Sequence, residues 1–225
     1  KLMSPVTEVF LRQIYFTGIQ AVPAVTISGL LIGLIIVLQT ASIAGTGSSN
    51  MIGKILLWLV LKEIGPFFTG LIILTRSGSA IATELATMKL GREIEYLEAM
   101  GIKPEVYLIK PRLYGVVCSA VILSIYFQLT AMFGGVFLAT LMSGIPFSDY
   151  ANAIVFHLSI KEIVISFLKS LIFGFLISLI CIWQGLSVMK SPTEIPQRAT
   201  KAVTGSLFSL FLIDVIIDVI AKIIE

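Results

Sequence analysis

The chain has 225 residues, of which 57% are hydrophobic and only 13% are charged, and its mean hydropathy is +1.01. A soluble domain has about 25% charged residues and cannot hide this much apolar surface from water. The composition therefore excludes a soluble enzyme, a nucleic-acid-binding protein and a disordered scaffold. It predicts an all-α integral membrane protein, with residues 1–225 forming a single membrane domain.

Five apolar stretches are long enough to cross a membrane, which takes about 20 residues per helix. Residues 1–19 are only partly apolar and predict a helix in the membrane interface. Because the chain begins at Lys1 and not at Met, we expect this segment to be incomplete. The third stretch is long enough for a kink near Gly134 and Gly135. The predicted spans are residues 20–39, 55–75, 113–142, 163–185 and 203–220.

The basic residues are distributed unevenly between the two sides that these spans define. Most of the 16 Lys and Arg residues lie in the first 19 residues, in the loop 76–112 and in the loop 186–202. The opposite loops, 40–54 and 143–162, contain only Lys54 and Lys161. The positive-inside rule therefore predicts a cytoplasmic N-terminus and a C-terminus on the outer side.

The loop between the second and third spans has the pattern of a short amphipathic helix over residues 92–100. Ile94, Leu97 and Met100 recur at helical spacing, and Gly101 is a good helix stop. Such a helix lies on lipid headgroups or docks into a groove of a soluble partner. Its acidic residues favour the protein partner over an anionic lipid surface. The residues that we assign to docking are Arg92, Glu93, Ile94, Glu95, Leu97, Glu98 and Met100.

Ionisable residues inside the spans form a second group of candidates, because each costs about 2.5–3.5 kcal/mol at mid-membrane. We expect ion pairs between Arg76 and Glu84 and between Lys169 and Asp214. These groups either fix helix packing, line a polar patch in a lipid-binding cavity, or relay protons. Nearby Phe side chains either line an apolar cavity for acyl chains or simply pack. The candidates are Glu63, Phe67, Arg76, Glu84, Lys169, Asp214 and Asp218.

Several chemical signatures are missing from the sequence. It has no G-x-x-x-x-G-K-[ST] phosphate loop, no H-E-x-x-H and no G-x-S-x-G, so we expect neither ATP binding nor catalysis in this chain. The two cysteines, Cys118 and Cys181, lie in apolar runs, and the single histidine is His157. We therefore expect no disulfide, metal or other cofactor in this chain.

The sequence resembles the permeases of bacterial and plastid lipid-transport ABC systems, the MlaE-type (YrbE-like) family. The segments that carry the resemblance are RQIYFTGIQAVP (Arg12–Pro23), GLLIGLIIVLQ (Gly29–Gln39), LKEIGP (Leu61–Pro66), LTRSGSAIATELATM (Leu74–Met88), EIEYLEAMGIKP (Glu93–Pro104) and YLIKPRL (Tyr107–Leu113). The chain departs from the family before the last span, where Pro192, Glu194 and Pro196 stand in place of glycines.

The resemblance implies a homodimer in the bacterial inner membrane that works with other proteins. It implies that a cytoplasmic ABC ATPase, which would hold ATP and Mg²⁺, docks on the predicted helix 92–100. This helix would then be the coupling helix. It also implies an MCE-domain substrate-binding protein on the outer side, a small cytoplasmic regulatory subunit, and phospholipid as the substrate.

Together these observations favour the permease subunit of an ABC transporter that moves phospholipid between the inner membrane and the periplasm or outer membrane. One alternative is an ion-coupled secondary transporter, which usually contains internal repeats that this sequence lacks. The other is a membrane scaffold that transports nothing.

Overall fold

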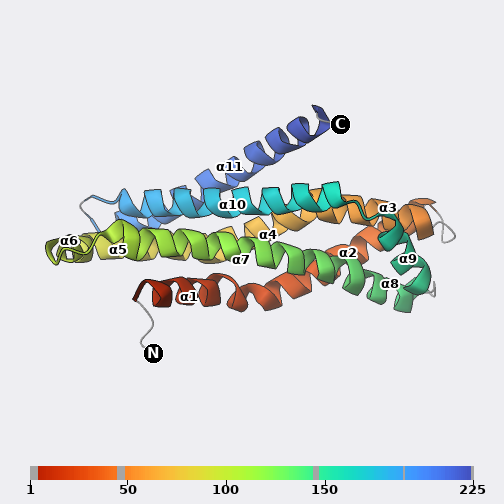
Figure 1. The fold of residues 1–225 in the computed structure, drawn as a ribbon, viewed down its shortest axis with the longest axis horizontal. Coiled ribbons are helices and arrows are strands. Elements are labelled where there is room, and N and C mark those ends of the chain that lie inside the picture. The colour runs from red at the N-terminus through yellow and green to blue at the C-terminus, as the bar shows by residue number, and fades with distance from the viewer. Residues whose placement is uncertain (1–4, 45–48, 144–146, 190, 224–225) are drawn as a thin grey trace. The chain divides into compact units, whose positions relative to one another are not determined.

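The computed structural model describes residues 5–44, 49–143, 147–189 and 191–223. Within these ranges the chain is helical and contains no strand (Figure 1). The α-helices are α1 (Pro5–Thr17), α2 (Val22–Ala44), α3 (Ser49–Trp58), α4 (Gly65–Ile73), α5 (Ser79–Leu90), α6 (Glu93–Ala99), α7 (Lys110–Leu129), α8 (Gly135–Ser143), α9 (Phe147–His157), α10 (Ile160–Leu186) and α11 (Glu194–Ile223).

Five short segments, wound more tightly or more widely than an α-helix, join these helices. The element η1 (Ile19–Ala21) is a 3₁₀ turn between α1 and α2. The other four are π-helical turns: η2 (Leu59–Ile64), η3 (Leu74–Gly78), η4 (Glu105–Ile109) and η5 (Thr130–Gly134). Turns of this type often mark functional positions in a helix. The turn η5 falls where the sequence predicts a kink, and η2 and η3 contain the candidate residues Glu63 and Arg76.

Among the residues that the structure describes, five helical stretches are long and apolar enough to cross a membrane, which confirms the predicted fold class. They are Val6–Ile43, Met51–Leu90, Glu105–Leu138, Ile160–Leu186 and Glu194–Ile223. Two predicted loops are shorter than expected, because α9 occupies the middle of loop 143–162 and α11 begins inside loop 186–202. Helix α11 tolerates Pro196 because a proline in the first helical turn removes no intrahelical hydrogen bond.

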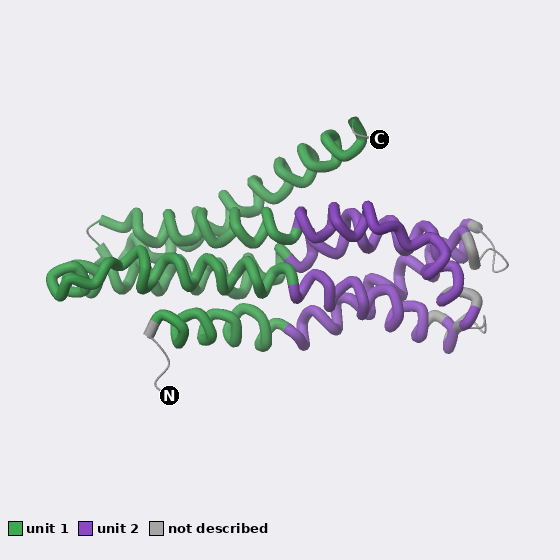
Figure 2. The backbone as a smooth tube through the Cα atoms, viewed as in Figure 1, with its two compact units in different colours: residues 1–21, 70–121, 170–225 green, residues 22–69, 122–169 purple. Residues whose placement is uncertain are grey.

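The chain divides into two compact units (Figure 2). Unit 1 contains residues 1–21, 70–121 and 170–225, and unit 2 contains residues 22–69 and 122–169. In unit 1, α11 packs against α5, and α1 packs against η4. In unit 2, α2 packs against α8 and η5, and α3 packs against α9.

Glycines allow close helix crossings in both units. In unit 2, a Cβ atom placed on Gly33 of α2 would lie 2.0 Å from the carbonyl oxygen of Ala131. In unit 1, a Cβ atom on Gly185 of α10 would lie 2.7 Å from the carbonyl oxygen of Ala82. The helix backbones therefore meet at distances that only a residue without a side chain allows.

Candidate docking helix and buried polar groups

Helix α6 is separated from α5 by a tight turn at Gly91 and Arg92. Arg92 has the left-handed conformation, with φ 58°, and its N–H donates to the carbonyl of Lys89 over 3.1 Å. The Gly91 N–H donates to the carbonyl of Thr87 over 2.9 Å. These two bonds satisfy the last carbonyls of α5, so α6 can start in a new direction directly after it.

The other end of α6 closes with a glycine cap. Gly101 has φ +76°, its N–H donates to Glu98 over 2.9 Å, and the Ile102 N–H donates to Leu97 over 2.9 Å. This pair of bonds is the Schellman arrangement, in which a left-handed glycine satisfies the last helical carbonyls. The sequence-based helix at residues 92–100 is therefore present as α6, one residue shorter at each end.

No residue of α6 is buried, and the predicted stripe of Ile94, Leu97 and Met100 contains only one of the two most exposed apolar groups of this segment. Tyr96 is 64% exposed, and Met100, directly after the helix, is 67% exposed. Ile94 and Leu97, by contrast, are only half-buried, while the charged residues of the predicted docking set are all exposed. Because Tyr96 and Met100 are four residues apart, they lie on one face, and Tyr96 is the residue of that face which the predicted stripe does not include.

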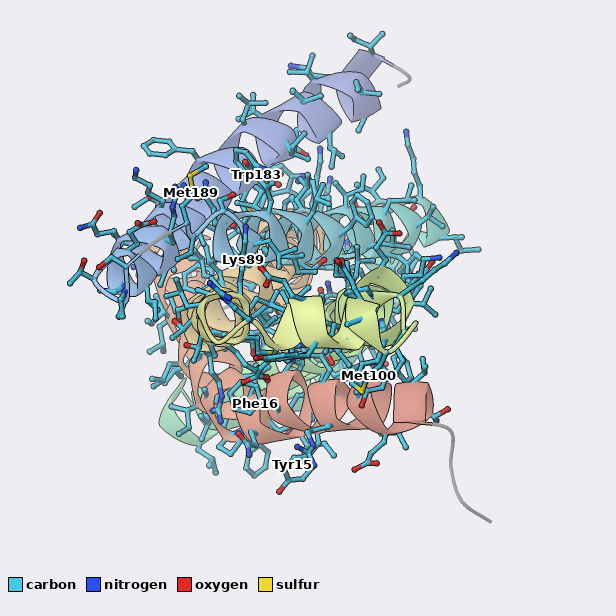
Figure 3. The ribbon with its side chains drawn as sticks, turned by 90° about the vertical axis from the view of Figure 1, so that its left-hand side faces the viewer. Tyr15, Phe16, Lys89, Met100, Trp183 and Met189 are labelled. Carbon is cyan, nitrogen blue, oxygen red and sulfur yellow. The ribbon has the colours of Figure 1, made fainter. Side chains whose placement is uncertain are left out.

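Ile94 and Glu98 line a cavity of about 710 Å³ beneath α6. Leu85 of α5, Leu108 of η4 and Leu186 at the end of α10 complete its apolar wall. The ammonium of Lys89 at the end of α5 donates a hydrogen bond to the carbonyl of Leu186. Figure 3 views this end of unit 1, with Lys89 and Met100 labelled. The inner face of α6 is thus only partly filled by its own chain.

The predicted ion pair between Arg76 and Glu84 is wrong. Arg76 instead donates through Nη2 to Oε1 of Gln20 over 3.1 Å. Glu84 accepts from Nη2 of Arg112, with Oε1 at 2.8 Å, and Arg112 is 95% buried. In the sequence, Arg112 belongs to the basic loop 76–112. Its burial depends on packing of α1 and α5 against the start of α7, which local sequence does not reveal.

Unit 2 contains a buried cation in its own ion pair. The Nζ atom of Lys169 on α10 lies 3.4 Å from Oε2 of Glu63 in η2. The Lys169 side chain is fully buried, whereas 31% of the Glu63 side chain is exposed. Glu63 is therefore a partner of Lys169 within unit 2. Asp214 belongs to unit 1, and its predicted pairing with Lys169 stays a prediction.

A hydrogen-bonded group lies one helical turn before Lys169. The side-chain amide of Gln128 on α7 donates to the hydroxyls of Ser166 and Ser124, and both serines are nearly fully buried. Gly65 leaves room for Gln128, since a Cβ atom there would lie 2.7 Å from its Cγ. Unit 2 thus has a continuous polar side on α10, facing α7 and η2.

The remaining intramembrane candidates are Phe67 in unit 2 and two aspartates in unit 1. Phe67 packs edge-to-face on Phe68, with ring centroids 6.5 Å apart, and Phe68 stacks on Phe127 at 6.3 Å. Phe127 is fully buried, so it belongs to the packed core of unit 2. Asp214 and Asp218 lie four residues apart on α11, and both are half-buried.

Helix α11 is less buried against the rest of the chain than the other four spans are. In its most apolar window of 18 residues, 11% of the residues are buried, against 33–50% in the other four spans. Its exposed apolar residues include Phe208, Phe211, Leu212 and Val215. This surface is available to lipid or to a second protein chain.

Residues 10–220 match the family model described as Permease MlaE. The chain belongs to this family. It is 26% identical over 211 residues to the intermembrane phospholipid transport system permease protein MlaE of Haemophilus influenzae, covering 93% of this chain and 81% of that protein. It is 25% identical over 200 residues to a probable ABC transporter permease protein of Rickettsia typhi, covering 88% and 77%.

The chain is also similar to a plant protein. The chloroplastic protein TRIGALACTOSYLDIACYLGLYCEROL 1 of Arabidopsis thaliana is 26% identical over 210 residues, which cover 92% of this chain and 60% of that protein. The matched region of the MlaE model includes α6, the π-helical turns and both candidate groups of polar residues.

Proposed function

We propose that this chain is the membrane-spanning subunit of an ABC transporter that moves phospholipid. The match of residues 10–220 to the MlaE permease model carries the proposal. It is supported by the name of the Haemophilus relative, which describes intermembrane phospholipid transport. The five apolar helices supply the membrane-spanning part, and ATP hydrolysis then belongs to a separate subunit that binds ATP and Mg²⁺.

In this proposal α6 is the coupling helix on which the cytoplasmic ATPase docks. Its exposed Tyr96 and Met100 present apolar side chains four residues apart, which is the spacing of a helix that inserts into a groove. Glu93, Glu95 and Glu98 are exposed on the same helix. Their negative charges would fix the orientation in which the ATPase docks. Movement of the ATPase would pass through α5 and η4, which flank α6, into the second and third spans.

The exposed apolar face of α11 favours a second copy of the chain as partner, with lipid held between the copies. Asp214, Asp218 and the Lys169–Glu63 pair would then handle the polar headgroup, while the aromatic groups near Phe67 would contact acyl chains. An MCE-domain protein on the outer side would exchange the lipid, and a small cytoplasmic subunit would regulate the ATPase. The proposed location is the bacterial inner membrane, with the N-terminus in the cytoplasm.

The docking helix can be tested by co-purification of the ATPase with the tagged full-length chain. We expect Tyr96→Asp and Met100→Glu each to weaken ATPase binding at least tenfold, because each buries a charge in an apolar contact. Leu97→Glu and Glu98→Lys extend the scan to the neighbouring faces. Met189→Glu is the matched control, since Met189 is 78% exposed at the same end of unit 1 but lies in the loop after α10.

The outcome separates docking from a general effect of surface charge. The proposal predicts that the Met189 variant binds the ATPase as the wild type does, while the Tyr96 and Met100 variants fold and remain in the membrane but lose it. Unchanged ATPase binding in both α6 variants would contradict the assignment of α6.

A further inference from the structure

A small cavity of about 160 Å³ in unit 1 lies where α1 crosses α5 and the start of α7. Its charged lining consists of Arg12, Glu84 and Arg112, and its apolar lining includes Val9, Phe16 and Ile81. Its lining includes no residue of α6. It has room for a few water molecules or for one phosphate-sized group.

Arg112, which lines this cavity, carries an unsatisfied donor. The Nη2 atom donates to Glu84 over 2.8 Å and lies 3.8 Å from the sulfur of Met88. The Nη1 atom is buried and has no hydrogen-bond partner among the residues that the structure describes. Leaving a charged N–H group buried and unpaired is unfavourable, so a hydrogen-bond acceptor that reaches Nη1 would stabilise this arrangement.

The charges around the cavity favour an anion as that acceptor. Arg12 and Arg112 together exceed Glu84 by one positive charge. The salt bridge of Arg12 to Glu8 is 3.6 Å long, with 82% and 71% of the two side chains exposed, so solvent screens it strongly. Arg12 is therefore free to turn toward an anion, and a singly charged group would balance the lining. A water molecule would accept a hydrogen bond from Nη1 but would not neutralise the excess positive charge of the lining.

We propose that Arg112 and Arg12 form a binding site for a phosphodiester, supplied by the headgroup of a membrane phospholipid. The phosphate oxygens would accept from Nη1 of Arg112 and from Arg12, while Glu84 keeps its bond to Nη2. Val9, Phe16 and Ile81 would contact the first carbons of the glycerol and acyl chains. A doubly charged phosphate is disfavoured, because its second charge would face the Glu84 carboxylate.

The position of α1 agrees with a lipid headgroup. Leu11 and Tyr15 on its outer side are 45% and 54% exposed, and Tyr15 points away from the neighbouring helices (Figure 3). Arg12 lies between them in sequence, so α1 has the mixed apolar and basic surface of a helix at the membrane interface. A lipid bound here would hold α1 against α5 and α7, and this role does not depend on transport.

The site can be tested on the full-length chain, purified in detergent and depleted of lipid. The thermal unfolding midpoint is followed during titration with dihexanoylphosphatidylglycerol, with inorganic phosphate, or with dihexanoylglycerol, which has no phosphate. We expect a saturable rise with phosphatidylglycerol alone. Arg12→Gln should raise the apparent dissociation constant about threefold or more, and Arg112→Lys about tenfold, because lysine lacks the forked donor geometry.

Lys110→Gln is the control, since Lys110 is an exposed cation two residues from Arg112 and does not line the cavity. It should bind as the wild type does. Because Arg12 is exposed, its variant keeps the test valid even if the Arg112 variant does not fold. Equal stabilisation by dihexanoylglycerol, or wild-type affinity in the Arg12 variant, would overturn the proposal. A saturable, Arg12-dependent rise with inorganic phosphate alone would support the anion site and overturn its assignment to lipid.

Discussion

The ammonium of Lys169 lies 3.4 Å from the carboxylate of Glu63, which joins a fully buried cation on α10 to the π-helical turn η2 of the second span. The two ends of this pair differ in their surroundings, since Lys169 has no exposed surface and Glu63 is about one-third exposed. Removing Lys169 and removing Glu63 should therefore lower the free energy of unfolding by different amounts.

We expect Glu63→Gln to lower the free energy of unfolding by on the order of 2–3 kcal/mol, because it removes a carboxylate from a buried ammonium. Lys169→Met should cost about 1 kcal/mol, since methionine packs well and Glu63 is partly exposed and not fully buried. The double variant should be close to Lys169→Met alone. Unfolding in a graded detergent mixture measures all three, and strictly additive losses would contradict a direct interaction.

The crossing at Gly33 and Ala131 gives a second prediction. Gly33→Ala should destabilise the chain by about 2 kcal/mol or more, because the new Cβ atom would overlap a backbone carbonyl that cannot move aside. Gly205→Ala in α11 is the control, since its nearest neighbour would be 3.7 Å away. Removing a helical glycine there should be neutral or stabilise the chain by up to about 1 kcal/mol. Equal effects of the two changes on the thermal midpoint would argue against the close crossing.

The glycine cap of α6 gives a third prediction. Gly101→Ala places a side chain on a left-handed residue, at a cost of about 1 kcal/mol. Helix α6 should then open more often, and amide hydrogen exchange over residues 93–102 should accelerate about fivefold. Gly91→Ala serves as the control, because the φ of Gly91 is −73° and the alanine fits. Unchanged exchange in the Gly101 variant would contradict the cap.

The two cysteines should differ in reactivity. Cys118 is exposed on α7, while Cys181 is fully buried and lies 3.8 Å from the hydroxyl of Ser206. We expect N-ethylmaleimide to modify one thiol in the folded protein, and Cys118→Ser to abolish the modification. Intact-mass measurement counts the adducts, and labelling that persists in the Cys118 variant would contradict the packing of α10 against α11.

The sequence was sufficient to predict the features that depend on local composition. The five spans follow from apolar length, and helix α6 follows from its spacing and from Gly101. The break near Gly134 was also expected, and it occurs as the turn η5. Each of these features is set by residues that are neighbours along the chain.

Features that depend on contacts between distant segments were predicted poorly. Glu84 pairs with Arg112 and not with Arg76, because the helices rotate Arg76 toward Gln20. Periodicity identified α6 but not which of its faces is open, since Ile94 turns toward a cavity formed by α5, η4 and α10. The buried state of Arg112 could have been suspected from its place next to an apolar span, where a cation needs a partner.

The central claim is that α6 couples an ATPase to phospholipid movement, and its most direct test is lipid transfer by the reconstituted complex. The chain and its ATPase are placed in liposomes with a fluorescent phospholipid, and transfer to an acceptor is followed with and without ATP. We predict that transfer requires ATP, is lost in Met100→Glu and persists in Met189→Glu. Transfer that is driven by an ion gradient without the ATPase, or that is unaffected by Met100→Glu, would contradict the account.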